Sequence, residues 1–300
     1  MYSKVLIPLD GSDTSEKVLP FARILATSLK LPIEFLEVVD IAAATAHMVA
    51  DKARYLGTII AQGERASREH LEEVAATFPG FRVTCRVEKG RPADAIIERA
   101  EAEKGTLIAM ATHGRAGVNR WMMGSVAEKV LRGTTAPLLL VRAGDDAESG
   151  RSATMKSIVV PLDGSELAES VLPTVCEVAK KLDLEILLCR AYELAATAYY
   201  GSEDYLPKYD DMLRDMKADV EGYLKKTAEA LAASGLTKVS CVALAGSDAE
   251  EIVRYANQHH DALLAMCTHG RSGVARWALG SVTEKVVRHA EEPVLVVHAA

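Results

Sequence analysis

The sequence predicts an α/β protein made of two similar domains in tandem, each with a five-stranded parallel sheet that carries helices on both faces. Two observations lead to this fold class. Segments of the first half recur in the second half in the same order, and short apolar runs alternate with helical patterns within each half. A length of 300 residues is also sufficient for two ordinary domains.

Three pairs of segments define the repeat. They are VLIPLDGSDTSEKVLP (5–20) with IVVPLDGSELAESVLP (158–173), KGRPADAII (89–97) with AGSDAEEIV (245–253), and ATHGRAGVNRWMMGSVAEKVLR (111–132) with CTHGRSGVARWALGSVTEKVVR (267–288). Each copy spans about 145 residues, which is the size of a domain rather than of a solenoid unit. We expect one domain over residues 1–145, a second over 155–300, and a polar linker over 146–154.

Most of the strands are predicted from continuous apolar runs, which are typical of strands buried on both faces of a sheet, and the third strand of the first copy is predicted from alternating apolar and polar residues. In the first copy they are expected at 4–10, 32–40, 82–90, 106–111 and 136–142. In the second copy they are expected at 156–163, 185–191, 238–244, 262–267 and 292–298.

Helical patterns connect these strands. In the first copy a helix capped by Ser12 or Ser15 should reach towards Leu29, a partly helical segment follows over 41–77, and two helices are expected at 92–104 and 124–131. In the second copy, the segment at 192–224 is rich in Tyr and acidic residues, and it fits either a lid or a surface connection followed by a long helix.

Composition excludes several classes of protein. A net charge of −7 without clustered Lys and Arg argues against nucleic acid as a main partner, and no apolar run is long enough to span a membrane. The five cysteines are scattered and form no CxxC pair, so neither a disulfide framework nor a zinc site is expected. Because the N-terminus also lacks the pattern of a signal peptide, we expect a cytoplasmic protein.

Parallel sheets bind ligands beyond the carboxyl ends of their strands, where the strand order reverses. In each copy this rule selects the turn after strand one, the end of strand two and the loop after strand four. In that loop Gly114 is followed nine residues later by Gly124 and Ser125, which begin a helix. A helix N-terminus presents unpaired N–H groups and a positive dipole end, so this loop suits a phosphate; a plain turn with a helix cap is the alternative.

Two further side-chain types admit more than one interpretation. Asp10 and Asp163 could hold ribose hydroxyls or a metal ion bound to phosphates, or they could form Asx turns that cap the following helix. His113 and His269 have no partner His or Cys at ligand spacing. A hydrogen bond to backbone or phosphate therefore fits them better than a metal or a general-base role.

These residues resemble the ATP-binding branch of the universal stress protein (UspA-like) family in its tandem form. That branch has a glycine, two residues, a second glycine, nine residues, and then Gly-Ser or Gly-Thr. The second glycine is Gly114 or Gly270, whereas Ala111 and Cys267 stand in place of the first. The resemblance implies two Rossmann-like UspA domains, each binding ATP, ADP or AMP, with Mg²⁺ held by the phosphates.

The resemblance also implies roles for particular positions. Main-chain groups near Val38 and Ala191 would contact adenine, and Asp10 and Asp163 would lie near the adenosine. In the first domain the expected nucleotide-binding residues are Pro8, Leu9, Asp10, Val38, Met110, Ala111, His113, Gly114, Gly124, Ser125 and Val126. In the second domain they are Pro161, Leu162, Asp163, Ala191, Met266, Cys267, His269, Gly270, Gly280, Ser281 and Val282. The last strands would associate the two domains as a pseudo-twofold dimer within the chain, and a further homodimer is left open.

The leading functional hypothesis is a stress-response regulator or switch that binds ATP and hydrolyses it slowly at most. The sequence has no Walker phosphate loop and no residue set that would activate a water. One alternative is an adenylating enzyme related to ATP pyrophosphatases, which DGSDTS (10–15) partly resembles, although DGSELA (163–168) does not and the double glycine is missing from both. Another is a UspA-like scaffold that has lost nucleotide binding because of Ala111 and Cys267.

Overall fold

The structure of the protein is a computed structural model, which describes residues 2–46, 55–112, 123–142, 153–193, 206–268 and 279–298. The chain forms two compact units, Met1–Ala153 and Thr154–Ala300, called the first and second domain below. Among the helices in the described ranges, none combines the length and apolar character needed to cross a membrane.

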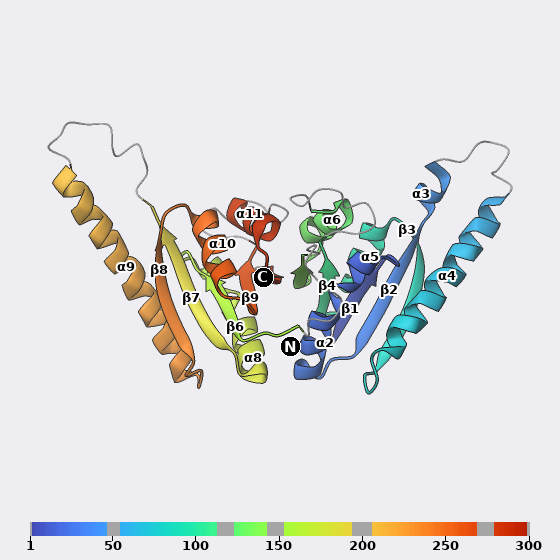
Figure 1. Cartoon of the computed structure of the whole chain (residues 1–300), viewed down its shortest axis with the longest axis horizontal. Coiled ribbons are helices and arrows are strands. Elements are labelled where there is room, and N and C mark those ends of the chain that lie inside the picture. The colour runs from blue at the N-terminus through green and yellow to red at the C-terminus, as the bar shows by residue number, and fades with distance from the viewer. Residues whose placement is uncertain are drawn as a thin grey trace. The chain divides into compact units, whose positions relative to one another are not determined.

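The first domain alternates strands and helices along the chain (Figure 1). Its elements are β1 (Lys4–Leu9), α1 (Asp13–Glu16), α2 (Leu19–Leu29), β2 (Ile33–Asp40), α3 (Ile41–Ala46), α4 (Leu56–Ala76), β3 (Val83–Gly90), α5 (Pro92–Glu101), β4 (Thr106–Ala111), α6 (Ser125–Gly133) and β5 (Leu138–Val141). The strands are parallel in the order β3-β2-β1-β4-β5. The strand order therefore reverses between β1 and β4.

The second domain repeats this arrangement. Its elements are β6 (Ser157–Pro161), α7 (Glu166–Glu169), α8 (Leu172–Leu182), β7 (Glu185–Tyr192), α9 (Leu206–Ala233), β8 (Val239–Ala245), α10 (Asp248–Gln258), β9 (Ala262–Cys267), α11 (Ser281–His289) and β10 (Val294–Val297). Its parallel order is β8-β7-β6-β9-β10. The predicted fold class, with five parallel strands in each domain, is confirmed.

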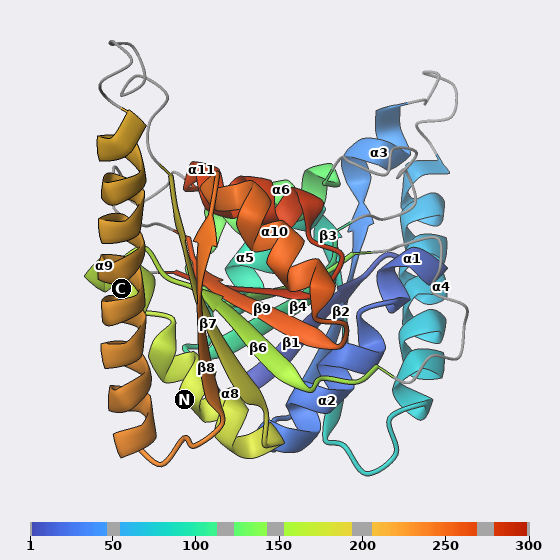
Figure 2. The same ribbon diagram turned by 60° about the vertical axis from the view of Figure 1, so that its left-hand side comes forward.

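Helices cover both faces of each sheet. The connections from β1 to β2 and from β2 to β3 are right-handed crossovers that place α2 and α4 on one face of the sheet. The chain then returns to β4 and β5 on the other side of β1, and these connections place α5 and α6 on the opposite face. In the second domain α8 and α9 share one face and α10 and α11 the other (Figures 1 and 2). The central strands are buried along their whole length, as in β1 and β4, which explains their continuous apolar sequences.

The helix predicted from Ser12 to Leu29 is in fact two helices, α1 and α2. Ser12 caps α1, because its Oγ accepts a hydrogen bond from the Ser15 N–H at 3.2 Å. Pro20 stands in the first turn of α2 and has no N–H to donate to the carbonyl four residues earlier, so one continuous helix cannot form there. The same break separates α7 from α8 in the second domain.

Candidate functional site

The sheet topology brings three of the predicted segments to one edge of the first domain. β1 lies between β2 and β4, with Lys4 opposite Thr106 and Leu9 opposite Glu37. The carboxyl ends of these three strands carry the predicted site residues Pro8, Leu9, Val38, Met110 and Ala111. The second domain places its counterparts at the matching edge, and these are Pro161, Leu162, Ala191, Met266 and Cys267.

The two aspartates after the first strands form Asx turns. Oδ1 of Asp10 accepts hydrogen bonds from the Ser12 N–H at 3.1 Å and the Ser12 hydroxyl at 2.5 Å. Oδ1 of Asp163 accepts the same pair from Ser165, at 2.9 and 2.6 Å. The Asx turns that the sequence offered as one interpretation of these aspartates are therefore present. Each turn holds its carboxylate in a fixed position at the carboxyl edge of the sheet.

The helices after β4 and β9 begin where the sequence predicts. Gly124 is the N-cap of α6 and Gly280 is the N-cap of α11. The Gly124 N–H donates to the Thr112 carbonyl at 2.7 Å, and the Gly280 N–H donates to the Thr268 carbonyl at 2.8 Å. These bonds tie each helix start to the end of the preceding strand. The first N–H groups of each helix have no partner within the helix itself, as a phosphate site requires.

The other half of the predicted phosphate loop lies outside the described residues. This holds for His113 and Gly114 in the first domain and for His269 and Gly270 in the second. The residues that replace the family's first glycine are described, and both Ala111 and Cys267 are buried. The Cys267 sulfur lies 3.2 Å from the hydroxyl of Ser170, the C-cap residue of α7, so the end of β9 is held against the end of α7.

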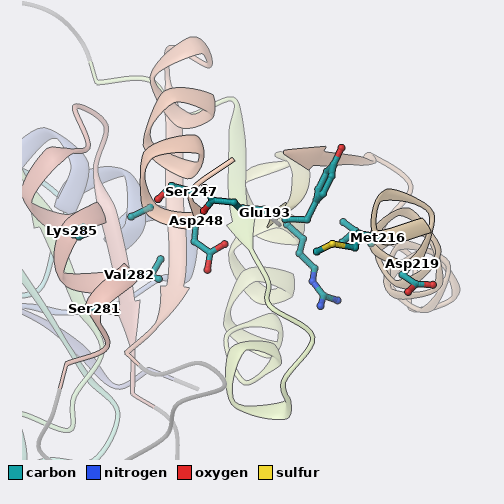
Figure 3. A pocket seen from close by; sticks show the side chains of 13 residues that line it. Glu193, Met216, Asp219, Ser247, Asp248, Ser281, Val282 and Lys285 are labelled. Atoms are coloured by element: carbon teal, nitrogen blue, oxygen red, sulfur yellow. The ribbon is translucent and has the colours of Figure 1, made fainter. Parts of the chain in front are cut away.

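A pocket of about 560 Å³ opens in the second domain (Figure 3). Three predicted site residues line it: Ala191 at the end of β7, and Ser281 and Val282 at the start of α11. Asp163, Gly280 and the strand-end residues of β6 and β9 are not among the residues that line it. The pocket thus brings together the segment predicted to contact adenine and the segment predicted to contact phosphate.

The other residues of this pocket were not among the predicted site residues, although several lie in the segment 192–224 or in the repeated segment 245–253. They come from the end of β7, from α9, from the turn before α10 and from α11, and they are Arg190, Tyr192, Glu193, Met216, Asp219, Val220, Ser247, Asp248, Ala249 and Lys285. Figure 3 shows Ser247, Asp248 and Val282 on one side, Met216 and Asp219 on the other, and Glu193 between them. Ser247, Asp248 and Ala249 lie in the repeated segment AGSDAEEIV, at the start of α10. The position of this repeated segment directly after a strand is the signal that could have identified these three residues.

The pocket contains charges of both signs. Burial raises the pKa of the Asp248 carboxyl, and the negative charges of Asp163 and Glu193 raise it further. Arg190 and Lys285 supply positive charge. Within the described residues, no cluster of three or more His, Cys, Asp or Glu side chains is arranged to hold a metal ion.

A polar chain beneath the candidate site of the first domain joins β2, α4 and α1. His70 Nδ1 lies 2.8 Å from Glu37 Oε2, and His70 Nε2 lies 3.1 Å from Glu16 Oε1. Ser67 Oγ donates to Glu37 Oε1 at 2.8 Å. Burial lowers the pKa of His70, but the hydrogen bonds to Glu16 and Glu37 outweigh burial, so that the net change is upward.

The second domain has different side chains at the matching positions. Arg190 occupies the position in β7 that Glu37 occupies in β2, and Tyr223 stands where the first domain has His70. The Tyr223 hydroxyl donates to Glu169 at 2.7 Å, and the Arg190 guanidinium lies 5.0 Å from the centre of the Tyr223 ring. Arg190 also approaches the turn after β6, where a Cβ on Gly164 would lie 2.7 Å from its Nη1. The two candidate sites therefore have different electrostatic surroundings.

Comparisons with known proteins all point to one family. A model of the universal stress protein family matches residues 1–142 and again residues 154–298. A universal stress protein of Methanocaldococcus jannaschii is 28% identical over 142 residues, which are 47% of this chain and 83% of that protein. One from Thermus aquaticus is 32% identical over 148 residues, which are 47% of this chain and 100% of that protein. The crystal structure of a universal stress protein from Archaeoglobus fulgidus shares the fold, with a TM-score of 0.70 at 23% identity over 99% of this chain and 98% of the other.

Proposed function

The chain belongs to the universal stress protein family, and on this premise we propose that it binds ATP or a related adenine nucleotide as a regulatory ligand. One observation carries the proposal: Ala191 and the Ser281–Val282 helix start, which the family resemblance assigns to opposite ends of a nucleotide, line one pocket. Its volume of about 560 Å³ lies in the range of roughly 300–1,000 Å³ usual for small-molecule sites.

The lining of the pocket fits the parts of an adenine nucleotide. The main chain at the end of β7 offers N–H and C=O groups for the edge of a base. The first N–H groups of α11, the Ser281 hydroxyl and the Lys285 ammonium suit phosphate oxygens, because donors and positive charge gather there. A Mg²⁺ ion that accompanies the nucleotide would be held through the phosphates.

We place the corresponding site of the first domain at the carboxyl edge of β2, β1 and β4. The main chain near Val38 would contact adenine, and Asp10 would lie near the adenosine. The phosphates would be contacted by Gly124, Ser125 and Val126. In this domain Glu37 and His70 replace Arg190 and Tyr223, so the two sites should differ in affinity. The protein would act as a stress-response switch whose state depends on nucleotide occupancy, with slow hydrolysis at most.

Calorimetric titration of ATP into nucleotide-free protein tests the proposal. Gly124 and Gly280 both have φ of −61°, which any residue can adopt, so Gly124→Tyr and Gly280→Tyr should place a bulky side chain at each helix start without backbone strain. Each variant should lower the ATP stoichiometry of an occupied site and leave the other site unchanged. Absence of ATP binding to the wild type, or a stoichiometry that neither variant changes, would overturn the proposal.

A further inference from the structure

The turn that follows the third strand differs between the two domains. Gly90 and Gly246 occupy the same position and both have positive φ, 142° and 134°. The next two residues are Arg91 and Pro92 in the first domain but Ser247 and Asp248 in the second. Asp248 therefore introduces a carboxylate where the first domain has a proline, and this carboxylate lines the pocket of the second domain.

Asp248 is the first residue of α10, a position at which the helix N-terminus ordinarily favours a negative charge. Asp248 is exposed to solvent, as is Glu250 in the same first turn, so exposure does not distinguish the two carboxylates. Asp248 lines the pocket together with Val282 and Glu193 (Figure 3), and the negative charges of Asp163 and Glu193 contribute to the raised pKa of its carboxyl. Asp248 is therefore placed to contact a molecule bound in this pocket.

Glu250 provides the comparison within the same helix. It also belongs to the first turn of α10 and carries the same charge, but it does not line the pocket. Any effect that is due only to helix stabilisation or to long-range charge should be shared by the two residues. An effect due to contact with a bound molecule should be confined to Asp248.

An ionised carboxylate only accepts hydrogen bonds, and phosphate oxygens of a nucleotide also only accept. With any Mg²⁺ ion held through the phosphates, Asp248 favours a nucleotide through the donors of its nucleoside part, which are the ribose hydroxyls and the exocyclic amine. We propose that Asp248 is a specificity-determining residue of the second domain, whose carboxylate accepts a hydrogen bond from one of these neutral donors. This inference rests on the proposed nucleotide site, and it implies that the first domain, with Pro92, lacks this selection.

The test measures affinity ratios in a Gly124→Tyr background, so that only the second site binds. ATP is compared with 2′-deoxy-ATP, 3′-deoxy-ATP and purine riboside triphosphate, which lacks the amine. The wild-type site should prefer ATP to one of these analogues by about tenfold or more, because the analogue lacks the donor and leaves the Asp248 carboxylate without its hydrogen bond. Asp248→Ala should abolish that preference, whereas Glu250→Ala should keep it.

Using a ratio separates the hydrogen bond from simple charge removal. Loss of a negative charge near the phosphates would strengthen binding of all four triphosphates by a similar factor and leave the ratios unchanged. The reciprocal change, Pro92→Asp in a Gly280→Tyr background, should create the same preference in the first domain. It also serves as the second test if Asp248→Ala lowers the midpoint of thermal unfolding.

The outcomes distinguish the inference from the proposed function. If the Gly124→Tyr protein binds ATP but Asp248→Ala and Glu250→Ala give the same analogue ratios as their parent, the role of Asp248 is refuted and the nucleotide site stands. If neither the wild type nor the Gly124→Tyr protein binds any of the four triphosphates, the proposed function fails and the inference fails with it.

Discussion

Glu34→Gln should destabilise the first domain by about 3–5 kcal/mol, because it leaves buried positive charges without their partner. The Glu34 carboxylate on β2 accepts a hydrogen bond from Lys4 Nζ at 2.7 Å, and both oxygens contact Arg99, with Nη2 at 2.9 Å from Oε2. The side chains of Lys4 and Glu34 are only 5% and 6% exposed, so water cannot replace the lost carboxylate, and Lys4 would keep only its longer 3.3 Å contact with the half-exposed Glu103. Arg86 Nε lies 3.2 Å from Oε1 and adds a partly exposed cation.

The effect of Glu34→Gln should also depend on pH. Burial alone would raise the pKa of Glu34, but the hydrogen bonds from Arg99 and Lys4 outweigh burial and lower it. A carboxyl whose folded pKa is lowered contributes stability above its ordinary value of about 4.3, and this contribution is lost as pH falls through the folded pKa. The difference in unfolding free energy between wild type and variant should therefore be larger at pH 7 than at pH 4.

The second domain supplies a matched control, because it has no ion cluster at the corresponding positions. Replacing the four charged residues together with their second-domain counterparts should leave stability within about 2 kcal/mol of wild type, since an uncharged set that already packs at these positions in the second domain can replace a buried ionic one. The replacements are Lys4→Ser, Glu34→Leu, Arg86→Val and Arg99→Tyr, after Ser157, Leu187, Val242 and Tyr255.

Urea unfolding followed by tryptophan fluorescence measures these differences. The chain has two tryptophans, Trp121 and Trp277, one in each half of the sequence. A Trp277→Phe background therefore makes the signal report the first domain. A loss below about 1 kcal/mol for Glu34→Gln at pH 7, or an equal loss at pH 4, would refute the assigned role of the cluster.

Two further predictions concern the matching polar chains. The raised pKa of His70 means that its bonds to Glu16 and Glu37 stabilise the first domain fully below about pH 6.5 and less as pH rises through the folded pKa. The stability difference between wild type and His70→Gln should thus shrink from pH 6 to pH 8.5 in the same urea assay, and growth of the difference would contradict this. Tyr223→Phe removes the 2.7 Å bond to Glu169 and should cost the second domain about 1.5–3 kcal/mol, measured in a Trp121→Phe background; an unchanged midpoint would show that the bond contributes nothing.

The fold was predictable because its signals are local. Strands such as β1 and β4 are buried along their whole length and appear as uninterrupted apolar runs, and the repeat shows that the pattern occurs twice. The break between α1 and α2 was missed although Pro20 marks it, because apolar spacing continues across the proline. The start of α6 at Ser125 was predictable from Gly124, which lies directly before it.

The candidate site was predictable only where its residues follow strands in a repeated motif. Ser281 and Val282 met that condition as part of the repeated loop after the fourth strand, whereas Ala191 was expected through the family resemblance. Met216 and Asp219 did not meet it, because the face that α9 presents depends on how a 28-residue helix packs on β7 and β8. The exchange of Glu37 for Arg190 was also hidden, since only the strand register shows that the two residues occupy the same place.

Titration of ATP into the wild type and the Gly280→Tyr variant tests the central claim most directly, which is that the pocket of the second domain binds an adenine nucleotide. We predict that the wild type binds ATP and that Gly280→Tyr loses one equivalent per chain, while both proteins unfold at the same temperature. An equal ATP stoichiometry in the two proteins, or no binding by the wild type, would contradict the claim.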